Sequence, residues 1–533
     1  MSESNLWILT FGNSTSLEMT KSLLDDQRTV WIVATLTILL FAIGNLPWQL
    51  DDYDQAKQAF TSFQMINEGQ WLYQQTPHEQ VATKPPLVGW VSAGLFALTR
   101  SWDVAWRLPS LIAAIGLAVL LFRLAGSAYG RVAGLIALAA FGLNLLSLRL
   151  ASLVRTDMPL AFVIFVIGVL IWKKIRTNIE WTAREQVYLF ALLTIAMLIK
   201  GPIVYAFVLP GIVLFQLRYG RARPPGAPFH NAWTAWWPWL ASLGIFLIWV
   251  IGGMVFQPGF YGEVVAREFL GRFGETIHRP QPFYFYLPHL LHKFAPWSVL
   301  IIAIAIIDLH SHKWRLRSAF REISPHTFWL MCWSIGALLV MSLIPSKRVD
   351  RIFPIVPPLC LLLAGQVAAL ISCSHGRVER LSTSVDSDST GLRAVATTNP
   401  QPRIYLWGAA ALFFAIFFTG GYTILKVASG YRHHGDALVV FGKEVRREAQ
   451  AHHWRYEVVS ARDEGLLLYM QKTHFIEPER AIAEWNNANV DALVASTEKA
   501  TGLMSQLQGA TLSRLKSRER KQEPGTNYVL ITR

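Results

Sequence analysis

The sequence predicts an α-helical protein that crosses a membrane many times and ends in a small α/β domain. First, 53% of its 533 residues are hydrophobic and only 16% are charged, a balance that suits lipid better than a soluble core. Second, the chain contains a series of apolar runs near the ~20 residues that a spanning helix needs. Third, after about residue 428, short β-prone segments alternate with polar helical ones.

We expect eleven spanning helices, or up to thirteen if hydropathy misses a pair, with a cytoplasmic N-terminus over residues 1–29. Lys- and Arg-rich loops follow four of the expected spans, which marks those loops as cytoplasmic. The apolar segment from Pro86 to Thr99 is too short to cross about 30 Å of hydrocarbon, so we expect a surface or re-entrant helix there. The expected spans are 30–47, 108–126, 132–150, 158–172, 187–199, 203–218, 233–256, 289–308, 327–344, 353–372 and 404–427.

The chain is expected to divide into a membrane domain and an outer domain. A membrane domain over 30–372 is followed by a Ser-, Thr- and Asp-rich segment, 373–402, which is typical of a flexible cytoplasmic linker. A last span, 403–428, then leads to an extracytoplasmic α/β domain over 429–533. In that domain ALVVFGKE, RYEVVSA, DALVAST and NYVLITR are predicted strands, and KEVRREAQAHH is a predicted helical stretch.

Composition and motifs exclude several classes of protein. The net charge of +14 does not indicate nucleic-acid binding, because the basic residues fall mainly in short loops between apolar runs. Cys332, Cys360 and Cys373 lack the spacing of a disulfide framework or a zinc site. The expected cytoplasmic loops contain no glycine-rich phosphate-binding motif, which argues against a nucleotide cofactor.

Five unusual polar stretches face the same, outer side in this topology. Charged loops that converge on one side of a helical bundle are typical of an active site. The stretches are the loop 48–85, RTDMP at 155–159, LIKGP at 198–202, the loop 257–288 and PSKRVDR at 345–351.

The first of these loops combines acidic and basic groups. Apolar residues recur near helical spacing in DYDQAKQAFTSFQMINEGQW, which predicts a helix lying along the membrane surface. Asp52 or Asp54 could serve only as its N-cap, worth ~1 kcal/mol. Lys84 adds a cation to the same loop. A carboxylate that accepts a proton and an ammonium that holds a phosphate are complementary tools for group transfer from a phosphate ester.

The next two stretches place ionisable groups at the ends of apolar runs. An arginine such as Arg155 can snorkel or form an ion pair at a membrane boundary, whereas Asp157 is too short to snorkel. Lys200 lies between two apolar runs, where Gly201 and Pro202 break the helix. It is either a ligand contact or a solvated lysine at a structural hinge.

The last two stretches are rich in cations. In the loop 257–288, FYFY is most simply an interfacial aromatic belt, while Arg272 and His278 are better candidates for ligand contact. Arginine grips phosphate through two parallel hydrogen bonds. PSKRVDR carries three cations within five residues at the entrance of a span, which suits an anionic head group. Its charged positions are Lys347, Arg348, Asp350 and Arg351.

These motifs, taken in order, resemble those of the bacterial aminoarabinose transferase family, within the wider superfamily of protein O-mannosyltransferases. They are DYDQAKQAF with EGQW, TKPPL, RLPS, RTDMPL, KGP, REFLGRF with FYFYLP, and SKRVDRIFPIVPPL. The resemblance covers roughly residues 45–365 and extends to a similar outer C-terminal domain. It implies a GT-C fold, a polyprenyl-phosphate sugar donor and a bacterial inner membrane location with the active site facing the periplasm.

The resemblance also assigns roles to individual residues. Asp54 stands where the family has its catalytic base, and Asp157 matches the second acidic residue of the family. Lys84 matches the lysine that contacts the donor phosphate, and Lys57 replaces a usual arginine. Basic positions of later loops correspond to Arg272 and Lys347.

Two positions depart from the family pattern. Thr83 stands where the family has glutamate, and Glu268 stands where it often has histidine. Because those two family residues are linked with a bound metal, the sequence leaves a divalent metal unassigned. The same departures leave the sugar and the acceptor open, including modification of lipid A or another cell-envelope glycan.

We therefore expect an inverting glycosyl transfer from polyprenyl phosphate to a hydroxyl or phosphate of a lipid, glycan or protein. Asp54 would accept the proton and Asp157 would position the sugar or the acceptor. A flippase or transporter for lipid-linked sugars is the alternative, but the sequence lacks the repeated halves with broken helices typical of transporters. Further candidates for substrate contact are Asp52, Lys57, Arg155, Lys200, His278, Arg348 and Arg351.

Overall fold

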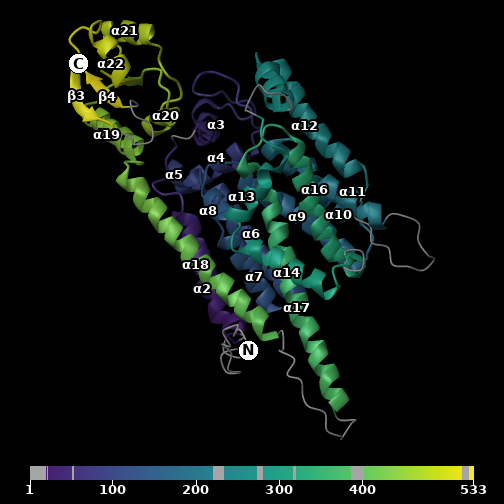
Figure 1. Ribbon diagram of the computed structural model, residues 1–533. Helices are drawn as coiled ribbons and strands as arrows, with labels where there is room; N and C mark the ends of the chain where they lie inside the picture. The colour runs from purple at the N-terminus through teal and green to yellow at the C-terminus, as the bar shows by residue number, and fades with distance from the viewer. Residues whose placement is uncertain are drawn as a thin grey trace.

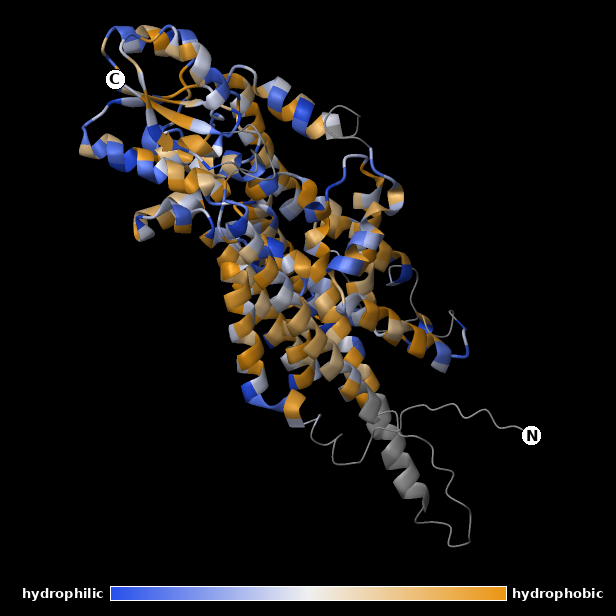
Figure 2. Ribbon diagram, turned by 60° about the vertical axis from the view of Figure 1, so that its left-hand side comes forward, coloured by the Kyte–Doolittle hydropathy of each residue, from blue (hydrophilic) through white to orange (hydrophobic). Residues whose placement is uncertain are grey.

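The fold is that of a helical bundle with a small mixed domain at one end, seen in a computed structural model (Figure 1). Polar residues gather at the ends of the bundle and on the C-terminal domain, while apolar residues cover the helices between them (Figure 2). This distribution is that of a membrane protein. The structure describes residues 20, 22–50, 53–219, 233, 235–272, 280–315, 320–385, 401–518 and 527–533.

Helices occupy all the positions at which spans are expected. Within the described residues, six helices are long and apolar enough to cross a membrane, and a seventh span arises if one pair bent by 102° counts as a single span. The six are Trp102–Tyr129, Asp157–Thr177, Trp237–Phe256, Pro325–Leu343, Val349–Ile371 and Tyr405–Arg432, and the bent pair is Phe283–Lys293 with Trp297–Ser311. The chain is thus a multi-pass membrane protein.

In chain order, the elements of the membrane domain are as follows. They are α2 (Gln27–Ile43), α3 (Tyr53–Glu68), α4 (Leu87–Thr99), α5 (Trp102–Ala105), α6 (Leu108–Tyr129), α7 (Arg131–Gly142), α8 (Leu145–Leu150), α9 (Asp157–Thr177), α10 (Ala183–Lys200), α11 (Ile203–Tyr219), α12 (Trp237–Phe256), η1 (Tyr261–Phe269), η2 (Leu270–Arg272), η3 (Phe283–Phe285), α13 (Tyr286–Lys293), α14 (Trp297–Ser311), α16 (Pro325–Leu343), η4 (Val349–Ile355), α17 (Val356–Val385) and α18 (Gln401–Arg432).

The span expected over 132–150 is not one helix. Asn144 breaks it into α7 and α8, because its side-chain amide donates to the carbonyl oxygens of Ala140 and Phe141. Its Oδ1 accepts a hydrogen bond from the backbone N–H of Ser147 at 2.9 Å, which caps α8. The break turns the chain so that the short α8 leads into the RTDMP stretch. The short helix expected near 86–99 is present as α4.

The helix expected along the membrane surface is present as α3, but protein covers its apolar stripe. Ala56, Phe60 and Phe63 are buried in one cluster with Phe441 and other apolar residues of the C-terminal domain. The backbone N–H of Leu50, just before α3, also donates to the hydroxyl of Tyr469 in that domain at 2.7 Å. An apolar stripe predicts burial without specifying the partner, and here the partner is the C-terminal domain.

The C-terminal domain has a four-stranded sheet in the order β1-β2-β4-β3, with β1 and β2 parallel and the other pairs antiparallel. One apolar cluster on this sheet joins α19, α20 and α3, and a second cluster includes residues of α21 and α22. The elements are α19 (Ala437–Ala451), β1 (Tyr456–Val458), α20 (Gly465–Met470), α21 (Pro478–Asn486), β2 (Ala492–Ser496), α22 (Thr497–Met504), β3 (Thr511–Lys516) and β4 (Tyr528–Thr532).

One expectation for this half of the chain was wrong. ALVVFGKE is not a strand but the first half of α19, since Leu438, Phe441 and Val445 recur at helical spacing and share one buried face. The linker expected over 373–402 stays a prediction; α17 continues into it as far as Val385, and α18 begins at Gln401. Residues 386–400 lie outside the described part of the chain.

Candidate active site

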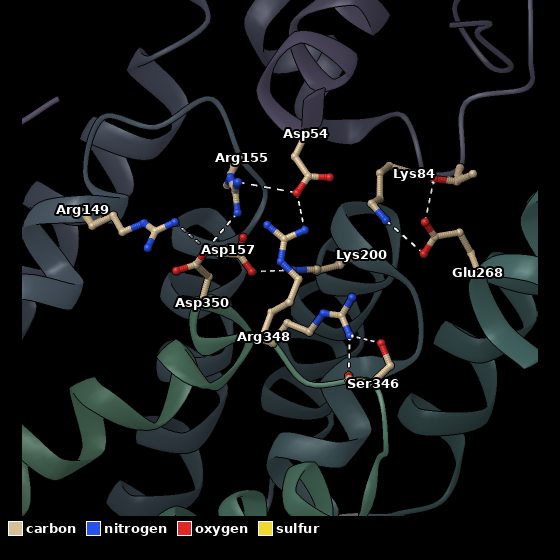
Figure 3. A network of polar contacts seen from close by, with 12 residues as sticks. Asp54, Lys84, Arg149, Arg155, Asp157, Lys200, Glu268, Ser346, Arg348 and Asp350 are labelled. Atoms are coloured by element: carbon tan, nitrogen blue, oxygen red, sulfur yellow. Dashed lines mark hydrogen bonds and ion pairs between the residues drawn. The ribbon is translucent and has the colours of Figure 1, made fainter. Parts of the chain in front are cut away.

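The polar stretches predicted to converge do so at one end of the bundle (Figure 3). Asp54 lies in the first turn of α3, Arg155 lies in the turn before α9, and Asp157 is the first residue of α9. Lys200 ends α10, and Arg348 immediately precedes η4. Helix dipoles favour the placements of Asp54, Asp157 and Lys200, because an acidic group suits a helix N-terminus and a cation suits a C-terminus.

Asp54 is held by two arginines. Its Oδ2 accepts a hydrogen bond from Nη1 of Arg348 and lies 3.5 Å from Nη2 of Arg155. Burial alone would raise the pKa of Asp54, but Arg348, Arg155 and the more distant Lys84 outweigh burial and hold its pKa below the usual value. Asp54 is therefore a carboxylate at neutral pH.

Arg155 joins Asp54 to a second carboxylate, Asp350. Nη1 of Arg155 lies 2.9 Å from Oδ2 of Asp350, and both side chains are less than a tenth exposed. Nη2 of Arg149, at the end of α8, lies 3.5 Å from the same oxygen. Removing one partner of such a buried ion pair strongly destabilises the folded protein, because the remaining charge is left unpaired in a medium of low dielectric constant.

Asp157 forms a separate pair with Lys200. Its Oδ1 accepts a hydrogen bond from the ammonium of Lys200, and both side chains are about a tenth exposed. Arg155 and Arg348 lie close enough to Asp157 to interact with it electrostatically. The two predicted acids therefore belong to one connected set of charges that comes from α3, α9, α10 and the start of η4.

Lys84 lies at one side of this set, paired with Glu268 of η1. Its Nζ is 3.3 Å from Oε2 of Glu268, and the hydroxyl of Thr83 donates to the other oxygen at 3.2 Å. These contacts do not fit the divalent metal that the family resemblance raises, because an ammonium and a hydroxyl already occupy the carboxylate. Within the described residues, no group of three or more His, Cys, Asp or Glu side chains could hold a metal ion.

Two of the remaining cations contact backbone oxygens. Lys347 is buried, and its Nζ donates to the carbonyl of Gln281 at 2.9 Å, which ties the start of η4 to the loop before η3. Burial lowers the pKa of Lys347. Nη1 of Arg351 donates to the carbonyl of Ser346 at 2.7 Å and therefore stiffens the same turn.

Four predicted site residues lie outside this cluster or outside the described structure. Lys57 interacts electrostatically with Glu464 of the C-terminal domain. Asp52 and His278 are not among the described residues, and only the backbone of Arg272 is described, at the end of η2.

Sequence reasoning passed over two members of the cluster. Arg149 is not among the predicted site residues, although it pairs with Asp350. Asp350 itself was noticed in KRVDR but not selected. The sequence feature that could have identified Asp350 is an aspartate between basic residues at the entrance of a span, where an isolated carboxylate would be costly.

Sequence comparisons with known proteins match large parts of the chain. Residues 83–252 match the family model described as dolichyl-phosphate-mannose-protein mannosyltransferase. An undecaprenyl phosphate-alpha-4-amino-4-deoxy-L-arabinose arabinosyl transferase of Sodalis glossinidius is 25% identical over 339 residues, 62% of this chain and 56% of that protein. Its counterpart from Shewanella sediminis is 24% identical over 67% of this chain and 63% of that protein. The chain thus spans about three fifths of the length of these relatives.

A solved structure covers more of the chain. The crystal structure of ArnT from Cupriavidus metallidurans bound to undecaprenyl phosphate superposes with a TM-score of 0.61, covering 94% of this chain and 97% of that one at 17% identity. At this identity the likeness concerns the fold. The sequence matches and the shared fold together confirm the resemblance of this chain to the aminoarabinose transferases and the wider GT-C superfamily.

Proposed function

We propose that the protein is a glycosyltransferase that moves a sugar from a polyprenyl-phosphate donor to an acceptor hydroxyl or phosphate. The observation that carries the proposal is the meeting of Asp54, Asp157 and Arg348 at one end of a membrane bundle. The similarity to undecaprenyl phosphate-dependent arabinosyl transferases supports this reading. The site would face the periplasm from a bacterial inner membrane.

The donor phosphate would be held by cations that now pair with carboxylates. Arg348 and Lys84 are both about a third exposed, and their partners are Asp54 and Glu268. A phosphate that enters between them can replace these carboxylates as the partner of a guanidinium and an ammonium. Arg272 and Lys347, which match basic positions of the family, would complete this anion site.

Asp54 would act as the catalytic base once the donor is bound. While Arg348 and Arg155 hold its carboxylate, its pKa is too low for effective proton transfer from a hydroxyl. When a donor phosphate binds Arg348, the attraction between Arg348 and the Asp54 carboxylate is weakened, and the pKa of Asp54 rises. Donor binding therefore prepares the base, and the acceptor is activated only in the loaded site.

The transfer itself would proceed in one inverting displacement. The acceptor oxygen forms a bond to the anomeric carbon while the bond from that carbon to the phosphate oxygen breaks. The electron pair leaves with the polyprenyl phosphate, whose growing charge is stabilised by the cations. The acceptor proton passes to Asp54 when the acceptor is a hydroxyl, and Asp157, fixed by Lys200, would position the sugar or the acceptor.

The variant Asp54→Asn tests the assignment of the base. We expect transfer of a labelled sugar from a polyprenyl-phosphate donor to fall by about 10²-fold or more. Binding of the donor phosphate should persist or tighten, because Arg348 loses its competing carboxylate. Glu79→Gln is a matched control, since Glu79 lies on the same loop and its side chain is 75% exposed. Asp54→Asn with wild-type turnover would contradict the assignment, and loss of donor binding without loss of fold would point to a binding role instead.

A further inference from the structure

A cavity of about 340 Å³ lies between the end of α18, the segment after α2 and the turn before α9. We propose that it binds the phosphate group of an anionic membrane lipid. Its volume is within the range of small-molecule sites. Its walls include Asn45, Trp48, Arg107, Ser152 and Lys426. The inference is independent of the proposed function, because none of the residues assigned above to the donor phosphate lines the cavity.

In the described part of the chain, the hydrogen bonds of two cations of the cavity wall go to neutral oxygens. Arg107 is 4% exposed, and its guanidinium donates to the backbone carbonyls of Asp103 at 2.7 Å and Trp48 at 2.6 Å. The ammonium of Lys426 donates to the carbonyl of Gly44 at 2.7 Å and to Oδ1 of Asn45 at 2.8 Å. These contacts fix the direction of both side chains without neutralising either charge.

No carboxylate lines the cavity in the described part of the chain. The nearest acidic influence on its cations is Asp103, which interacts electrostatically with Arg107 but is not a lining residue. Buried positive charges without a carboxylate are costly, because the low local dielectric constant penalises an uncompensated charge. A phosphate oxygen placed between the two cations would supply the missing negative charge and accept charge-assisted hydrogen bonds.

The position of the cavity favours a lipid over a soluble anion. It opens where the exposed apolar side of α18 ends, one turn beyond Tyr422. That side of α18 carries large exposed residues, including Phe414, Phe418 and Leu425. α18 runs along the edge of the bundle beside α2, so its outer side is free to contact acyl chains (Figure 1). A lipid lying against α18 would place its phosphate at Lys426, at the boundary where cations meet head groups.

Two glycines allow the end of α18 and the segment after α2 to approach each other closely at the cavity wall. A Cβ on Gly430 of α18 would come within 2.8 Å of Cδ of Pro47, and one on Gly435 would collide with the side-chain amide of Gln49. The two glycines therefore let the end of α18 pack directly onto the chain after α2. Because this packing closes one side of the cavity, a bound lipid phosphate would tie α18 to α2.

The test measures lipid binding by the purified full chain in detergent. Phosphatidylglycerol, phosphatidylcholine and inorganic phosphate are added separately, and bound lipid is counted by native mass spectrometry beside the thermal unfolding midpoint. We expect phosphatidylglycerol to bind and stabilise the wild type, with weaker effects of the other two probes. Lys426→Gln should weaken phosphatidylglycerol binding about tenfold, because one charged hydrogen bond to phosphate is lost.

Arg432→Gln is the matched control, since Arg432 is an exposed cation on the same helix and does not line the cavity. Equal phosphatidylglycerol affinity in Lys426→Gln and Arg432→Gln would overturn the proposal. An effect of inorganic phosphate that matches the lipid and disappears in Lys426→Gln would assign a soluble anion to the cavity and also overturn it. If Lys426→Gln does not fold, Ser429→Trp fills the exposed edge of the cavity, and unchanged lipid binding in that variant refutes the inference.

Discussion

We predict that Glu464 makes the contact between the C-terminal domain and the rest of the protein dependent on pH. Its side chain is 3% exposed, its Oε1 lies 4.0 Å from Nε2 of His78, and its Oε2 has no hydrogen-bond partner among the described residues. Burial raises the pKa of Glu464 from 4.5 to about 7, although the positive charge of Lys57 opposes the shift. The folded chain therefore keeps a proton on Glu464 that the unfolded chain has already released.

The sign of the effect follows from this difference in bound protons. Between pH 4.5 and about 7 the folded state binds more protons, so the free energy of unfolding falls as the pH rises and levels off above pH 7. The full effect is on the order of 3 kcal/mol, since each tenfold change in proton affinity corresponds to ~1.4 kcal/mol. Glu464→Gln stays neutral at every pH and should remove the decline.

Hydrogen exchange of the α20 backbone amides measures this local stability in the full chain. From pH 5 to pH 8.5, protection factors corrected for intrinsic exchange should fall by up to about a hundredfold in the wild type and stay nearly constant in Glu464→Gln. Glu444→Gln, an exposed glutamate of α19, should behave as the wild type. His78→Asn is a second control, because it removes the imidazole near Oε1 of Glu464. Protection that declines equally in Glu464→Gln and the wild type would refute the reasoning.

Three further predictions concern the buried charges and the packing of the bundle. Asp350→Ala leaves two arginines without their shared carboxylate and should lower the free energy of unfolding by about 3–5 kcal/mol, measured as a drop in the thermal midpoint. Lys200→Met should lower the free energy of unfolding, because it leaves the charge of Asp157 without its partner. Adding Asp157→Asn should restore most of this stability without restoring sugar transfer. If the two substitutions instead lower the free energy of unfolding additively, the pairing is contradicted. Gly168→Leu should prevent folding or strongly reduce the yield, because a Cβ there collides with the ring of Trp333, whereas Gly126→Leu, with open space around its Cβ, should be tolerated.

Apolar runs predicted the positions of the membrane helices apart from the break at Asn144, and charged motifs predicted which stretches meet (Figure 3). Asp54 and Asp157 were selected because carboxylates at the ends of apolar runs are costly unless they have partners, and Arg348 was selected because three cations lie within five residues at the entrance of a span. The partners themselves could not be assigned, because residues such as Arg155 and Asp350 are distant in sequence and pair only through the packing of the bundle. Sequence spacing carries no information about such contacts.

Each error in the prediction of secondary structure has its own physical cause. ALVVFGKE was read as a strand because short apolar runs suit either a strand or one face of a helix, and tertiary packing in α19 decided for the helix. Asn144 was not recognised as a break, because its capping role depends on hydrogen bonds that only the folded turn reveals. β3 was missed because its residues are mostly exposed and carry charges, so it lacks the buried pattern of β2 and β4.

The position of α3 between the bundle and the C-terminal domain gives that domain a mechanical role. The same helix that carries Asp54 in its first turn packs Phe60 and Phe63 against the C-terminal domain, so a shift of that domain would move the helix. Truncating the chain after α18 would remove the part of the apolar cover that the C-terminal domain gives to those two rings, while Trp102 would still contact Phe63. The domain therefore supports the helix that carries Asp54, and alterations far from the charged cluster can change its geometry.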